Sequence, residues 1–179
     1  MLHLERVNGK RLFKEGDTVL YGVNGICEIT DISTIDIPHV DKNRVFYILH
    51  QKAGSGTIYV PVDGDISKMR RLISKADALD IISKISDLEP LKLKDKKKPE
   101  AEYRETLAKY DCIEMLKLIK CIYLRKKQRT DEGKKATEAD EKYMRLAEDM
   151  LYHEIGIALD IPKAEVLNYL IDKIDGVTT

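Results

Sequence analysis

The fold of the N-terminal half depends on the stretch Phe13-Lys-Glu-Gly-Asp-Thr-Val-Leu-Tyr-Gly-Val-Asn-Gly-Ile-Cys-Glu-Ile29. Gly16 and the segment 22–25 are turn signals, because glycine and asparagine adopt positive φ at little steric cost. Residues 18–21 between them are β-branched or apolar and end in an aromatic residue, a composition typical of strands. A short strand between two glycine turns predicts the start of a small, strongly bent β-barrel.

The segments that follow predict more short strands, separated by turn signals. Strands are expected over 26–32, 44–50, 57–60 and 69–73, with turns or loops at 36–43, 53–56 and 63–65. About five short strands in this order favour a small antiparallel β-barrel of the SH3 or Tudor kind over residues 13–73. Residues 1–12, which Gly9 interrupts, are interpreted as an N-terminal arm.

From Ser74 the apolar spacing changes from that of strands to that of helices. Ser74 is a candidate N-cap for a connecting helix over 74–86. Residues 87–100 contain two prolines and five lysines, which predicts a basic linker between two domains.

Residues 101–179 then predict a compact bundle of about four short helices, and the fold class is α+β with two domains. A buried central helix is expected over 112–124, where only three polar residues interrupt the apolar run. Thr137, followed three residues later by Asp140, resembles a capping box, and Pro162 fits the first turn of a last helix.

Composition excludes several classes of protein. Apolar residues make up 43% of the chain, so a core can form, and 31 basic residues balance 31 acidic ones, so any nucleic-acid contact must come from local charge. No apolar run reaches the roughly 20 residues of a membrane span, and the N-terminus lacks the apolar centre of a signal peptide. We therefore expect a cytoplasmic protein without membrane contact. Three cysteines and four histidines are scattered, so we expect no metal site, disulfide framework or cofactor.

No motif of a known catalytic chemistry occurs, and we do not expect an enzyme. The remaining signals are two basic clusters, lysines 92, 94, 96, 97 and 98 and the basic residues of 125–129 with Lys134 and Lys135. Each cluster is either a solvated segment or a contact for nucleic-acid phosphates. Lysines and arginines near the C-terminus of a helix also interact favourably with its dipole, which agrees with the first alternative. Tyr103 and Arg104 could add an aromatic platform and a guanidinium, although Tyr103 suits a core position equally well.

Two sets of motifs resemble the CarD/CdnL family of bacterial transcription regulators. The first set is Phe13-Lys-x-Gly-Asp-Thr-Val-Leu-Tyr-Gly-x-x-Gly-Ile-Cys27, Phe46-Tyr-Ile-Leu49, Thr57-Ile-Tyr-Val-Pro-Val-Asp63 and Met69-Arg-Arg-Leu-Ile73. The second set is Leu118-Ile-Lys-Cys-Ile-Tyr-Leu-Arg-Lys-Lys127, Gly133-Lys-Lys135, Leu151-Tyr-His-Glu154 and Ile161-Pro162. They occur in the family's order over roughly residues 11–174.

The resemblance implies that the N-terminal barrel is similar to the polymerase-interacting domain of transcription-repair coupling factor and docks on the lobe of the RNA polymerase β subunit. The polymerase-facing positions of the family fall near Ile35 and Tyr59, where familiar members carry arginines.

The helical domain would contact the backbone and minor groove of promoter DNA at the upstream edge of the bubble and stabilise the open complex. A tryptophan that acts there as a wedge in the family corresponds to a position near Pro99, and this chain contains no tryptophan. Arg104 and Arg125 match DNA-contacting positions, and Lys142 is next to another. The complete set of expected DNA-contacting residues is Lys97, Lys98, Pro99, Tyr103, Arg104, Arg125, Lys126 and Lys142.

Three classes of function stay open at this point. The first is a polymerase-bound regulator that tunes open-complex stability, and the second is a protein–protein interaction module of the transcription machinery without direct DNA contact. An enzyme is the third, which only a polar pocket with converging titratable groups would support.

Overall fold

The computed structural model describes residues 12–177 of the chain, with side chains to residue 173. It divides into two compact units, Met1–Leu72 and Ile73–Thr179. The arm predicted over 1–12 lies outside the described residues except for Leu12.

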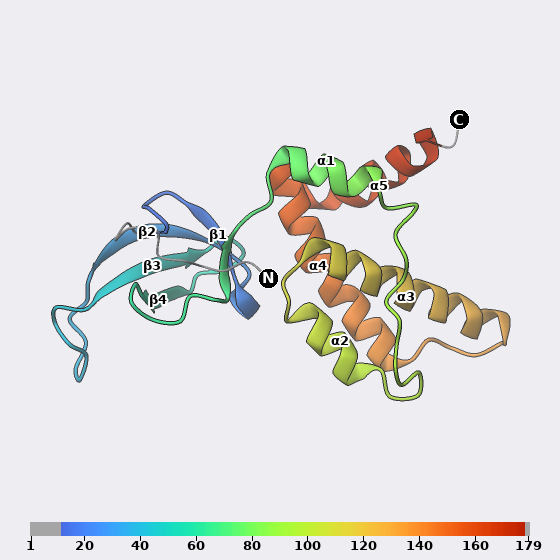
Figure 1. Cartoon of the computed structure of the whole chain (residues 1–179), viewed down its shortest axis with the longest axis horizontal. Coiled ribbons are helices and arrows are strands. Elements are labelled where there is room, and N and C mark those ends of the chain that lie inside the picture. The colour runs from blue at the N-terminus through green and yellow to red at the C-terminus, as the bar shows by residue number, and fades with distance from the viewer. Residues whose placement is uncertain (1–11, 178–179) are drawn as a thin grey trace. The chain divides into compact units, whose positions relative to one another are not determined.

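The described part of the N-terminal unit, residues 12–72, forms an antiparallel sheet of five strands in the order β4-β3-β2-β1-β5. The strands are β1 (Thr18–Tyr21), β2 (Ile26–Thr34), β3 (Val45–Gln51), β4 (Thr57–Pro61) and β5 (Met69–Arg71). Figure 1 shows β2 and β3 as the long strands of this unit. The five predicted strands and their antiparallel pairing are therefore confirmed.

The glycine turn between β1 and β2 adopts the backbone geometry that its sequence predicts. A short 3₁₀ segment, Gly22–Asn24, leads to Gly25 at φ 72° and ψ −148°, a region that only glycine occupies without strain. The turn brings Val19 opposite Cys27, and both side chains are fully buried. Phe13 packs edge-on against Tyr47 of β3, with ring centroids 5.9 Å apart.

The sheet does not close on itself within the described residues. Strands β4 and β5 are its two edges, and the ladder runs from one to the other without pairing them. A break in the β2–β3 register between Ile29 and Asp31 indicates a bulge, which increases the twist of the long strands. The structure shows an α+β protein with an open, antiparallel five-stranded sheet.

The second unit, as far as it is described (residues 73–177), contains five helices. They are α1 (Lys75–Ser83), α2 (Glu100–Leu107), α3 (Cys112–Asp131), α4 (Glu138–Leu159) and α5 (Lys163–Val177). Ser74 caps α1 with a complete capping box, and Thr137 caps α4 by accepting a hydrogen bond from the Asp140 amide over 3.1 Å. Both N-caps were predicted, but the carboxylate of Asp140 does not complete a box and takes other partners.

The central helix of the bundle is α4, which packs against each of the other four helices. The prediction that the 112–124 helix would be central is thus corrected, although α3 contributes Met115, Leu118 and Ile122 to the same core. The reason lies in the apolar pattern of α4, a helix of 22 residues in which buried apolar positions repeat from Tyr143 to Leu159.

Residues 87–100 do not form a linker between the two units, because the boundary between the units falls between Leu72 and Ile73 in the sequence. Three leucines of this segment, Leu88, Leu91 and Leu93, pack against the helical core. The Leu91 amide donates to the Lys117 carbonyl over 3.0 Å, which ties the segment to α3. In Figure 1 the segment leads from the end of α1 across α3 to the start of α2. The linker prediction weighed the lysines and prolines, whereas the leucines between them determine where the backbone lies.

Candidate functional site

The two positions expected to face a protein partner lie in the N-terminal unit. Tyr59 is in the edge strand β4 and is 46% exposed, while its neighbour Val60 is buried in the sheet. Alternation along a strand places these two side chains on opposite faces, so Tyr59 points outward. Ile35 follows the last residue of β2 and is half-buried.

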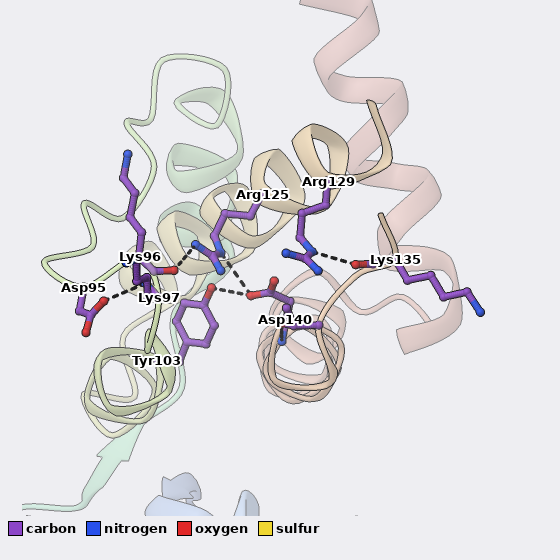
Figure 2. A network of polar contacts seen from close by, with 9 residues as sticks. Asp95, Lys96, Lys97, Tyr103, Arg125, Arg129, Lys135 and Asp140 are labelled. Carbon is purple, nitrogen blue, oxygen red and sulfur yellow. Dashed lines mark hydrogen bonds and ion pairs between the residues drawn. The ribbon is translucent and has the colours of Figure 1, made fainter. Parts of the chain in front are cut away.

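A buried polar network joins three helices of the second unit. The hydroxyl of Tyr103 on α2 donates a 2.7 Å hydrogen bond to Oδ1 of Asp140 in the first turn of α4. Nε of Arg125 on α3 donates to the same oxygen over 3.3 Å. Figure 2 shows the three side chains converging between the helices. Tyr103 and Asp140 are fully buried, and the side chain of Arg125 is only 20% exposed.

The electrostatics of this network follow from its burial. Removal from water raises the pKa of the Tyr103 phenol, and the neighbouring Asp140 carboxylate raises it further. Burial lowers the pKa of the Arg125 guanidinium, but its attraction to Tyr103 and Asp140 outweighs this, and the net shift of that pKa is upward. Oδ2 of Asp140 accepts no hydrogen bond from the residues that the structure describes. The network is a structural charge pair of Arg125 and Asp140, in which the carboxylate at the centre also accepts the Tyr103 hydroxyl, and it is suited to holding three helices in register.

Arg125 also reaches the segment that carries the lysines. One of its terminal nitrogens donates to the carbonyl of Lys96 over 3.1 Å. On the same turn, Oδ1 of Asp95 accepts the amide of Lys97 over 2.8 Å, and Figure 2 shows the Lys96 side chain directed away from the network. Arg125 therefore connects the buried carboxylate to the basic turn at the surface.

The remaining expected DNA contacts divide by exposure. Lys97, Lys98, Arg104 and Lys142 are exposed, and Lys126 is half-buried on α3. Lys142 lies 4.0 Å from a carboxylate oxygen of Glu100, an exposed pair that contributes little.

Pro99 and Tyr103 are buried and offer no surface to a partner in this structure. Of the two readings of Tyr103, the core tyrosine is the one that the structure shows.

Sequence reasoning missed the carboxylates that organise this region, Asp95, Glu102 and Asp140. Asp140 was recognised only as part of a helix start, and its buried position was not foreseen. The buried position of Asp140 could have been suggested by Tyr103 and Arg125, which lie on the apolar faces of two helices. A guanidinium that is buried there requires an anionic partner.

The arrangement presents the ammonium groups of Lys97, Lys98 and Lys142 at the surface. Among the side chains that the structure describes, in residues 12–173, no three from His, Cys, Asp or Glu come together as a metal site would require. Across the same described part of the chain, no helix is both long and apolar enough to cross a membrane. What the geometry can do chemically is bind an anionic partner by charge and hydrogen bonding.

Comparison with known protein families finds one match in the sequence. Residues 13–73 match the family model of the CarD-like/TRCF RID domain. This span contains all five strands of the N-terminal unit, and it confirms the resemblance for that part of the chain. No curated protein matches the sequence.

Proposed function

We propose, from the premise that the N-terminal unit is a CarD-like/TRCF RID domain, that this protein is a transcription regulator that binds RNA polymerase and promoter DNA. The family match over residues 13–73 is the observation that carries this proposal. In it, the sheet docks on the lobe of the polymerase β subunit, and the helical unit contacts DNA at the upstream edge of the bubble. The result is a change in the stability of the open complex.

The exposure of Tyr59 on an edge strand supports a contact with the polymerase at that position. Aromatic side chains provide large contact areas at interfaces, and an edge strand has backbone groups free for pairing. Ile35 is half-buried and would contribute a smaller apolar contact at the end of β2. Neither residue is charged, so we expect this contact to depend weakly on salt.

On the DNA side, the proposal rests on the exposed basic residues of the helical unit. Lys97, Lys98, Arg104 and Lys142 would contact phosphates, and each contact adds affinity that falls with salt. Lys126 is half-buried and can reach a phosphate only with its terminal ammonium.

Wedging at the bubble edge is the weaker part of the mechanism in this chain. Pro99 and Tyr103 are buried, and the sequence contains no tryptophan. We infer that this protein contacts mainly the phosphates of the DNA, and that the polymerase makes the contacts with bases at the bubble edge.

Strong DNA affinity is not required for this role. Binding of one unit to the polymerase turns DNA contact by the other into an intramolecular event, with effective concentrations that reach the millimolar range for short connections. Because the units meet between Leu72 and Ile73, the connection in this chain is short. The overall charge balance, 31 against 31, would then keep the protein from accumulating on bulk DNA.

Three further parts of the proposal follow from the same premise. The open sheet belongs to a bent, SH3- or Tudor-like module, the protein acts by binding and not as an enzyme, and it works where the polymerase does, in the bacterial cytoplasm.

The experiment that tests the proposal is a pull-down of the isolated polymerase β lobe with the full-length chain. We expect retention of the lobe, and a loss of about tenfold in affinity for Tyr59→Ala, because an aromatic anchor typically contributes more than 1 kcal/mol. Val23→Ala is the matched control, since it also removes an exposed apolar side chain from the N-terminal unit. If the lobe is not retained by the wild-type chain, the proposal is wrong. Open-complex lifetime on a promoter, measured with and without the protein, tests the DNA half.

The second candidate is an interaction module of the transcription machinery that does not touch DNA. Two observations favour it: Arg125 is engaged with Asp140, and Lys142 is near Glu100. In that case alanine at Lys97, Lys98 and Lys142 would change neither DNA binding nor its dependence on salt. In the first candidate each such change reduces the salt slope by about one.

A further inference from the structure

The turn that carries the lysines is shaped by one carboxylate from the following helix. Glu102 is in the first turn of α2, and its two oxygens accept the Lys94 amide at 3.0 Å each. Oε1 also accepts the Asp95 amide over 3.0 Å. These backbone hydrogen bonds lower the pKa of Glu102, so the carboxylate stays ionised and keeps its hold at neutral pH.

Two more side chains hold the rest of this turn. Oδ1 of Asp95 accepts the amides of Lys97 and Lys98, at 2.8 and 3.2 Å. Arg125 donates to the Lys96 carbonyl over 3.1 Å and is itself held by Asp140. Every residue from 94 to 98 therefore has a backbone group bound by a side chain.

The side chains that project from this turn are available to an outside partner. Lys96, Lys97 and Lys98 are exposed, and their ammonium groups form no ion pair with any residue that the structure describes. The nearby carboxylates of Asp95 and Glu102 are bonded to backbone amides instead. Three adjacent cations on an ordered backbone lose less entropy on binding than three on a mobile one.

We propose that Glu102 and Arg125 are positioning residues that hold the 94–98 turn in the conformation in which its lysines bind the phosphate backbone of DNA. This inference rests on the proposed function and deepens it. It also assigns Arg125 a different role from the direct phosphate contact that the family resemblance implies, since its guanidinium is directed at a carboxylate and a carbonyl.

Glu102→Gln separates positioning from simple charge, because the two predict effects of opposite sign. Removal of a negative charge beside the lysines should tighten DNA binding, by about twofold for a charge near 10 Å at low salt. Loss of the turn should weaken it, because glutamine has one acceptor oxygen for three hydrogen bonds and turns an amide donor toward backbone donors. We expect the second effect to dominate and binding to weaken by about fivefold.

Glu105→Gln is the matched control. It makes the same change of charge on the same helix, and Glu105 is exposed and forms no hydrogen bond or ion pair with any described residue. This control should bind DNA as tightly as the wild-type chain or up to about twofold more tightly.

The test measures binding of a short fluorescent DNA duplex to the full-length chain by anisotropy at low salt, with hydrogen exchange of the Lys94 and Asp95 amides in the same variants. The inference predicts faster exchange and weaker binding for Glu102→Gln, and neither for Glu105→Gln. It is overturned if Glu102→Gln binds like Glu105→Gln, or if its exchange is unchanged. Two other results would overturn the proposed DNA contact of this turn, and the inference with it. One is a wild-type chain that does not bind the duplex. The other is a triple variant, Lys96→Ala with Lys97→Ala and Lys98→Ala, that binds like the wild-type chain.

Discussion

Replacing Tyr103 by phenylalanine removes a single hydroxyl from the centre of the helical unit. That hydroxyl donates a 2.7 Å hydrogen bond to a fully buried carboxylate, and a bond to a charged acceptor is worth about 1.5–3 kcal/mol. Asp140 would keep only the 3.3 Å bond from Arg125 on Oδ1, while its Oδ2 already lacks a donor within the described residues. We therefore expect the upper part of that range, about 2–3 kcal/mol of lost unfolding free energy.

Thermal and chemical denaturation of the full-length chain measure this loss. For a unit of about 100 residues, 2–3 kcal/mol corresponds to a fall in Tm of about 10–15 °C. Tyr143→Phe is the control, because the Tyr143 ring lies 5.5 Å from that of Tyr103 and the Tyr143 hydroxyl forms no hydrogen bond with any group that the structure describes. Its effect should stay within about 0.5 kcal/mol. Equal stability of the two variants would refute the view that the hydroxyl holds Asp140 in place.

The pH dependence of stability gives an independent check on the same bond. Burial and the Asp140 carboxylate raise the pKa of Tyr103 in the folded state. Its contribution is then fully present below the phenol pKa of about 10 in the unfolded chain and is lost as the pH rises above it. Above pH 10, the unfolding free energy of the wild-type chain should therefore fall more steeply with pH than that of Tyr103→Phe. Parallel curves would contradict the assignment.

Three other predictions concern single positions. Glu154→Leu should lower the unfolding free energy by about 2–3 kcal/mol, because the buried carboxylate accepts the Ile73 amide over 3.0 Å. Urea denaturation measures this loss, and Glu154→Gln should lower the unfolding free energy less because it keeps an acceptor. Gly25→Ala should destabilise the N-terminal unit by about 1–3 kcal/mol in the same measurement, since the cost is backbone strain and the space for a Cβ is open. Hydrogen bonds from two lysines lower the pKa of Glu114, so its contribution to folding stability is present above the ordinary glutamate pKa of about 4.3 and is lost as the pH falls below it. Glu114→Gln should therefore be less stable than the wild-type chain at neutral pH, and its unfolding free energy should fall less steeply as the solution is acidified.

The strands and their turns could be predicted because their signals are local. Gly25 must adopt a backbone conformation open only to glycine, and the alternation around Val19 and Cys27 matches their burial. Closure of the sheet could not be predicted in the same way, because it depends on how far β4 and β5 are carried by twist and by the bulge near Ile29, which no short sequence pattern specifies.

The helices were predicted from periodicity, but the path of the chain between them was not. Residues 87–100 have a composition typical of a solvated linker, and still Leu91 is tied to α3 by its backbone. Tertiary partners decide such a segment, and they are distant in sequence: Lys117 for Leu91, Arg125 for Lys96. The buried pairing of Tyr103 with Asp140, 37 residues apart, escaped prediction for the same reason.

The balance of 31 basic and 31 acidic residues predicts that any DNA contact is local, and the structure shows how a local basic surface persists in a neutral chain. The acidic residues nearest the lysines, Asp95 and Glu102, bind backbone amides, and Asp140 is inside the helical core. Their charges still lower the local potential, so they would be a disadvantage in a surface that bound phosphate by charge alone. Their presence is consistent with a surface in which the order of the lysines matters more than their number. The different effects expected for Glu102→Gln and Glu105→Gln follow from this, because each variant removes one negative charge from α2 and only Glu102→Gln releases the turn.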